Sequence, residues 1–133
     1  MVPKTKYVID IGFATFDLYE NYLVATVNEG VLFDTPHLLK FYDIFDTHYY
    51  NRPFGYISDR KNDYTINPTC YKDANRFNPN LVGVATLCYS EATYEISLFA
   101  GQFFDYKHCP FYTMKECVAW INLQLLENKK ADL

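Results

Sequence analysis

The chain has 133 residues, half of them hydrophobic, and a formal net charge of −4 at pH 7. This length and apolar content predict one domain over residues 1–133 with a core of its own. The mixed charges form no basic face, which argues against nucleic acid as a partner. No run approaches the roughly 20 apolar residues that a membrane span needs.

The four cysteines, at positions 70, 88, 109 and 117, show no paired spacing of the kind that holds zinc. Cys88 falls in a predicted strand and Cys117 on a predicted buried helix face, which favours reduced, buried thiols. We expect no metal, no cofactor and no secretory leader. A cytoplasmic protein follows from these expectations.

The first half of the chain predicts a hairpin, a helix and a central strand. Residues 6–18 alternate as a strand, and a turn joins them to a second, antiparallel strand over residues 22–28. Thr35 and Pro36 mark a helix start, because threonine caps helices and proline suits the first helical position. Aromatic residues at helical spacing extend this helix to about residue 50. Residues 54–57 are typical of a buried strand.

The second half predicts alternating helices and strands. Asn67-Pro68 opens a short helix that runs to about Asn75, and residues 81–89 form a central strand covered on both faces. Ser90 caps the next helix. Its predicted inward stripe is Ala92, Ile96, Phe99 and Phe103.

A short edge strand is predicted around Pro110-Phe111, before the final helix. Thr113 and Glu116 form a capping box at its start. Trp120 and Leu123 fall outside its buried stripe and are candidates for a self-association surface of a homodimer, unless loops cover them. Residues 128–133 are predicted to be a frayed tail.

The stretch that follows the strand at residues 54–57 is the candidate working surface. Six consecutive polar residues, Ser58 to Asp63, come before the next helix start, and partners dock at such strand ends in α/β sheets. An ordinary solvated loop is the alternative. The candidate binding residues are Ser58, Asp59, Arg60, Asn62, Tyr64, Thr65 and Asn67.

These elements predict an α/β fold: a mixed, mostly parallel sheet of about four or five strands with an N-terminal antiparallel hairpin and about four helices. The order resembles the STAS domain, the SpoIIAA-like fold of anti-sigma factor antagonists, in a small stand-alone bacterial form. The likeness rests on the hairpin 7–28, the strand–loop–helix 54–71, and the ending from Pro110-Phe111 to Ile121. It spans nearly the whole chain, as a pattern of elements.

The resemblance implies a non-catalytic regulatory module that acts by binding a protein partner. In family members that are phosphorylated, a serine follows the third strand in a turn at a helix start. Here Ser58 precedes Asp59 in inverted order and the family's glycine is absent, so Ser58, Thr65 and Thr69 are the candidate phosphorylation sites.

Two alternatives remain open. A carrier would hold a small apolar ligand or lipid between the sheet and the aromatic helices, against Phe41, Phe45, Phe99 and Phe103. A small hydrolase would use Ser58 and Asp59, but the sequence has neither a GxSxG elbow nor a phosphate-binding glycine loop. We therefore predict binding without catalysis.

Overall fold

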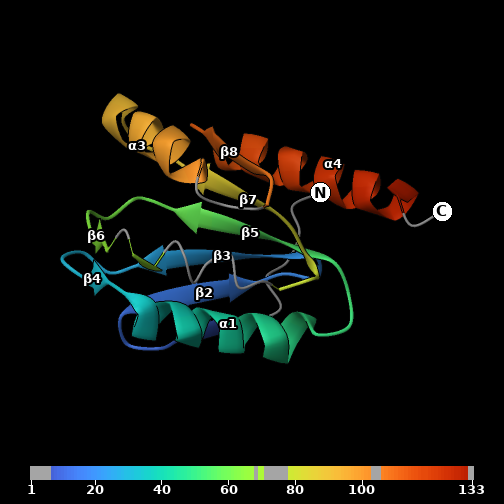
Figure 1. Cartoon of the computed structure of the whole chain (residues 1–133), viewed down its shortest axis with the longest axis horizontal. Helices are drawn as coiled ribbons and strands as arrows, with labels where there is room; N and C mark the ends of the chain where they lie inside the picture. The colour runs from blue at the N-terminus through green and yellow to red at the C-terminus, as the bar shows by residue number, and fades with distance from the viewer. Residues whose placement is uncertain (1–6, 68, 71–77, 103–105, 132–133) are drawn as a thin grey trace.

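The computed structural model describes residues 7–67, 69–70, 78–102 and 106–131 (Figure 1). A six-stranded sheet with the order β1-β2-β3-β5-β7-β8 forms its centre, and β4 pairs with β6 in a separate two-stranded sheet. The elements are β1 (Tyr7–Asp10), β2 (Ala14–Leu18), β3 (Tyr22–Val27), β4 (Leu32–Phe33), α1 (Thr35–Tyr49), β5 (Phe54–Asp59), β6 (Thr65–Ile66), β7 (Leu81–Leu87), α3 (Glu91–Gly101), β8 (His108–Phe111) and α4 (Met114–Ala131).

The sheet is mixed, as the sequence predicts. β1, β2 and β3 pair antiparallel, while β3, β5, β7 and β8 run parallel. The strand and helix numbers differ from the prediction: the main sheet has six strands, and three helices lie within the described residues. The helix predicted from Asn67 to about Asn75 falls largely outside those residues. α4 continues to Ala131, beyond the start of the predicted tail.

The predicted strand over residues 6–18 is in fact two strands, β1 and β2. Gly12 lies between them with a φ of 93°, a conformation that residues with a side chain rarely adopt. The Asp10 carboxylate accepts a hydrogen bond from the Gly12 amide at 2.8 Å, and the Asn28 side chain donates to the Gly12 carbonyl. Apolar alternation continues through this turn, so the pattern alone does not reveal it.

Two helices cover opposite faces of the sheet. α1 packs on one face and α4 on the other, with β5 and β7 between them (Figure 1). The α1 face carries the larger hydrophobic cluster, centred on Phe16, Phe41 and Phe54. The α4 face carries a second cluster around Ile57, Cys117 and Ile121. β5 and β7 are buried on both faces, which explains their nearly continuous apolar sequences.

The two glycines of β5 and β7 face α4 and allow it to lie close to the sheet. Gly55 and Gly83 are register partners on neighbouring strands. A Cβ added at Gly55 would collide with Cγ2 of Ile121, and one added at Gly83 would lie 2.9 Å from Cη2 of Trp120. The absence of a side chain at these two positions therefore leaves the space that Ile121 and Trp120 occupy.

Helix α1 is capped by Asp34, not by Thr35 as predicted. The Asp34 carboxylate accepts a hydrogen bond from the Thr35 amide at 2.8 Å, and the His37 ring accepts one from the Asp34 amide at 3.0 Å. Asn67 also donates to the Asp34 carboxylate. Asp34 is the cap because its carboxylate takes part in a capping box with His37 and also accepts the hydrogen bond from Asn67, which follows β6.

The inward face of α3 differs from the predicted stripe. Ser97 and Ala100 are its buried residues, whereas Ile96 and Phe99 are exposed. Small and polar residues face inward here because α3 approaches closely at His108, whose ring Nδ1 lies against Gly101. Ser90 caps the helix as predicted, accepting from the Thr93 amide.

Candidate functional site

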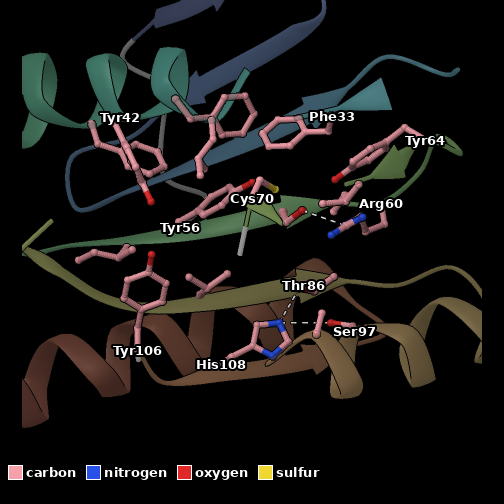
Figure 2. Close-up of a pocket in the computed structure, with 18 residues that line it drawn as sticks. Phe33, Tyr42, Tyr56, Arg60, Tyr64, Cys70, Thr86, Ser97, Tyr106 and His108 are labelled. Carbon is pink, nitrogen blue, oxygen red and sulfur yellow. Dashed lines mark hydrogen bonds between the residues drawn. The ribbon is translucent and has the colours of Figure 1, made fainter. Parts of the chain in front are cut away.

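A pocket lies on the α1 face of the sheet, between α1, the strands β5 and β7, and α3 with β8 (Figure 2). The space inside it that the centres of water-sized molecules can reach is about 90 Å³, which is room for several water molecules or for part of a small ligand. The residues that line it are Phe33, Leu38, Phe41, Tyr42, Phe45, Tyr56, Ser58, Arg60, Tyr64, Ile66, Cys70, Leu81, Val84, Thr86, Ser97, Ala100, Tyr106 and His108.

One wall of the pocket is aromatic. Phe41 and Phe45 come from α1 at the i, i+4 spacing that places both on the same helix face. Their ring centroids lie 6.2 Å and 5.5 Å from that of Tyr56 on β5. Burial raises the pKa of Tyr56, so this phenol stays neutral. The wall therefore offers apolar surface with a few hydroxyl groups at fixed positions.

Arg60 lies toward one end of the pocket, together with Tyr64, while Tyr42 and Tyr106 lie toward the other (Figure 2). Its Nε donates a hydrogen bond to the Ser58 hydroxyl at 3.1 Å. The guanidinium stacks over the Tyr64 ring, 4.7 Å from the centroid. These two contacts hold the planar group in one orientation.

Three polar side chains from three elements meet on the opposite side of the pocket (Figure 2). Nε2 of His108 on β8 lies 2.9 Å from the Thr86 hydroxyl on β7 and 3.2 Å from the Ser97 hydroxyl on α3. Burial, and secondarily the positive charge of Arg60, lowers the pKa of His108 to about 4. The imidazole is therefore neutral at pH 7, and the cluster joins α3 to the sheet.

Of the seven predicted binding residues, three line the pocket, three hold the loop in place, and Asp59 belongs to neither group. Ser58, Arg60 and Tyr64 line it. Asn62, Thr65 and Asn67 instead fix the loop to the rest of the chain: Asn62 donates to the Val27 carbonyl, and the amides of Thr65 and Asn67 donate to the carbonyls of Val31 and Phe33. The hydrogen bonds of Thr65 and Asn67 belong to the parallel pairing of β6 with β4.

Ser58 and Asp59 point to opposite faces of the sheet, because they are consecutive residues of β5. Ser58 faces the pocket and is only 5% exposed. Asp59 lies near Tyr89, whose pKa is raised to about 12 by burial and then by this carboxylate. This alternation of side chains argues against the two residues acting together on one substrate.

The candidate phosphorylation sites differ in access. Ser58 is buried, whereas Thr65 and Thr69 are exposed. The Thr69 amide and hydroxyl both donate to the Asn67 side chain, at 3.1 Å and 3.0 Å. Thr65 and Thr69 stay candidates.

Trp120 and Leu123, the predicted self-association residues, occupy different environments. Trp120 is partly buried over Gly83, and its ring centroid lies 6.1 Å from that of Phe111. It packs on the sheet itself, because the missing Cβ of Gly83 opens a place for the indole. Leu123 is exposed.

The residues that the sequence did not single out are Tyr56, Thr86, Ser97, Tyr106 and His108. Thr86 and Tyr56 are polar residues in strands that are otherwise apolar and predicted to be buried. A polar side chain in such a strand can indicate a binding site, and this pattern would have pointed to both residues. No sequence signal brings Ser97 and His108 together, because that contact depends on how α3 packs on β8. Of the predicted carrier residues, Phe41 and Phe45 line the pocket, Phe99 is exposed on the outer side of α3, and Phe103 lies outside the described residues.

The cysteines of the described chain carry free thiols, and Cys70, Cys88 and Cys117 are buried. Burial raises the pKa of Cys117 to about 12, so this thiol stays protonated. Among the described residues, no group of three or more histidine, cysteine or acidic side chains is arranged to hold a metal ion. No described helix has the length and apolar character to cross a bilayer.

The strand order, the parallel centre and the helices on both faces define a SpoIIAA-like α/β fold. A solved structure from Shewanella loihica PV-4, described as an uncharacterized protein of the DUF3478 family with a SpoIIAA-like fold, superposes with a TM-score of 0.58. The match covers 86% of this chain and 90% of that one at 10% identity. The expected SpoIIAA-like fold is thus confirmed. No known family model matches the chain, and neither does any curated protein.

Proposed function

We propose that the chain is a non-catalytic binding module whose pocket holds a small, largely apolar ligand between α1 and the sheet. The observation that carries this proposal is the pocket itself, since a domain core of this size is normally close-packed. Its lining combines an aromatic wall with a few polar groups in fixed positions, which is the usual composition of a small-molecule site.

Binding without chemistry is favoured by the arrangement of the polar groups. The Ser97 and Thr86 hydroxyls both lie at the same nitrogen of His108, and both residues are almost completely buried. Each hydroxyl is thus paired with the imidazole inside the protein. Arg60, the one cation among the described lining residues, is held by Ser58 and Tyr64. These contacts position groups for recognition.

Filling the pocket tests the proposal. Ala100→Leu adds a larger side chain to the pocket from α3, and the neutral dye N-phenylnaphthylamine is a suitable probe. We expect the variant to bind the dye about fivefold more weakly or worse, because the leucine takes space that the ligand needs. Thermal unfolding should show an equal or higher Tm, because filling a void removes a defect.

Ala92→Leu is the matched control, since Ala92 is exposed on the same helix and the exchange of residue types is identical. It should bind the dye as the unmodified chain does. Equal binding by all three proteins would show that the dye does not enter the pocket. Native mass spectrometry of the purified chain would in addition detect a ligand that copurifies.

Regulation of a protein partner is a second candidate function, and one observation favours it. The loop after β5 exposes Lys61, Asp63 and Thr65. Ile96 on α3 is 66% exposed, and a second hollow is lined by residues of both this loop and α3. Affinity purification with the native chain and with Lys61→Glu tests this contact. An unchanged set of bound proteins would remove the loop as its site.

A further inference from the structure

We infer that the ligand of this pocket carries a carboxylate, which Arg60 binds, and that its apolar body lies along the aromatic wall of Phe41, Phe45 and Tyr56. This inference rests on the proposed function, because it names the chemical class of the ligand for the same pocket. Three features of the described residues support it: the orientation of Arg60, the absence of a negative charge beside it, and the size of the positive charge.

Arg60 is held in place by groups that leave its outer nitrogens available. Nε donates to Ser58, the backbone amide donates to the Leu87 carbonyl at 3.0 Å, and the ring of Tyr64 supports the guanidinium. The two terminal nitrogens have no hydrogen-bond or ion-pair partner within the described parts of the chain. A fixed, planar pair of donors of this kind matches the two oxygens of a carboxylate.

Among the described residues that line the pocket, none is an aspartate or a glutamate. The nearest acidic residue in sequence, Asp59, faces the other side of the sheet. Lys107 and Glu127 form the only ion pair among the described residues, and neither belongs to the lining. Within the described parts of the chain, no acidic side chain therefore balances the charge of the partly buried Arg60, and this charge contributes to the lowered pKa of His108 across the pocket. A positive field in a partly apolar cavity attracts an anion.

The magnitude of the charge selects among anions. Arg60 supplies one positive charge, and His108 adds none at pH 7 because its pKa is about 4. The single negative charge of a monocarboxylate balances the charge of Arg60. A phosphate monoester carries nearly two negative charges, so one of them would stay unbalanced in an apolar environment. Arg60 also lines the second hollow together with Tyr64 and Ser97. The carboxylate would thus be bound at the end where the two hollows meet, with the body directed inward.

A series of matched probes tests the head group. Phenylbutyrate, phenylbutanol and phenylbutylamine share one apolar body and differ in charge, and calorimetry measures their binding. We expect the affinity for the acid to be at least about tenfold higher than that for the alcohol. The amine should have the lowest affinity of the three. Arg60→Gln should reduce the affinity for the acid to that for the alcohol and leave the alcohol unchanged. Arg60→Lys should give an intermediate affinity for the acid, because it keeps the charge and loses the planar pair of donors.

Lys61→Gln is the matched control, since it removes an exposed positive charge next to Arg60, and it should bind the acid normally. If acid and alcohol bind equally and Ala100→Leu weakens both, the pocket is a binding site and the carboxylate inference is wrong. If the acid binds the Ala100→Leu variant as tightly as the unmodified chain, it binds outside the pocket and the inference is also wrong. If neither these probes nor the neutral dye bind, both the carboxylate inference and the proposed binding function are wrong.

Discussion

Gly55→Val is expected to lower the free energy of unfolding by about 3 kcal/mol, because a side chain at this position enters the space that Ile121 occupies. Gly55 lies in the central strand β5, and Ile121 is fully buried in α4. Three atoms of the Ile121 side chain, Cγ2, Cδ1 and Cγ1, stand in the way of a Cβ. Isoleucine is β-branched and therefore has few alternative χ1 rotamers that would move these atoms away.

A double-mutant cycle isolates this contact. Ile121→Ala alone should cost about 2–5 kcal/mol through the cavity it leaves. The double variant Gly55→Val/Ile121→Ala should lose less than the sum, because the valine occupies part of that cavity. Leu126→Ala, on an exposed part of α4, is the control and should be additive with Gly55→Val. Urea unfolding measures all values, and additivity in both pairs would contradict the packing described.

The second large effect concerns pH. His108 has a pKa near 6.5 when exposed and about 4 in the folded chain, because burial and Arg60 disfavour its charged form. The unfolded chain therefore binds this proton more readily, and the free energy of unfolding falls as the pH drops from about 6.5 to about 4. Above pH 6.5 the stabilising contribution is fully present. It amounts to on the order of 3 kcal/mol.

His108→Gln is expected to remove this part of the pH dependence while keeping a polar group near Thr86 and Ser97. Urea unfolding of both proteins at pH 7, 5.5 and 4 should show a smaller loss for the variant. A direct readout is the imidazole resonance of His108 in the folded chain, which should titrate near pH 4. A midpoint near 6.5, or equal pH dependence of the two proteins, would contradict the burial described here.

The parallel centre of the fold follows from the sequence because β5 and β7 are short apolar runs separated by helical patterns, and such runs have few alternatives. The break at Gly12 and the pairing of β4 with β6 do not follow from it. The first depends on a backbone angle, and the second on hydrogen bonds between residues more than 30 positions apart, such as that from Thr65 to Val31.

The candidate site could be predicted only in part, for a similar reason. Arg60 and Tyr64 stand out as polar residues after a central strand, and the helical spacing of Phe41 and Phe45 marks one wall. The other wall depends on α3, where the apolar pattern is misleading: Phe99 faces outward, and Ser97 faces inward to meet His108. Only the packing of α3 on β8 decides which of these faces the sheet.

Because α4 packs directly against Gly55 and Gly83, the two faces of the sheet differ in how much they can move. Ile121 and Trp120 already contact the backbone at Gly55 and Gly83. The sheet therefore cannot move closer to α4 when a ligand enters the pocket on the opposite face. We therefore expect that a ligand bound in the pocket, as proposed, is accommodated by movement of α1 and α3. Occupancy would be visible from outside as a displacement of these two helices, while α4 stays still as a fixed reference.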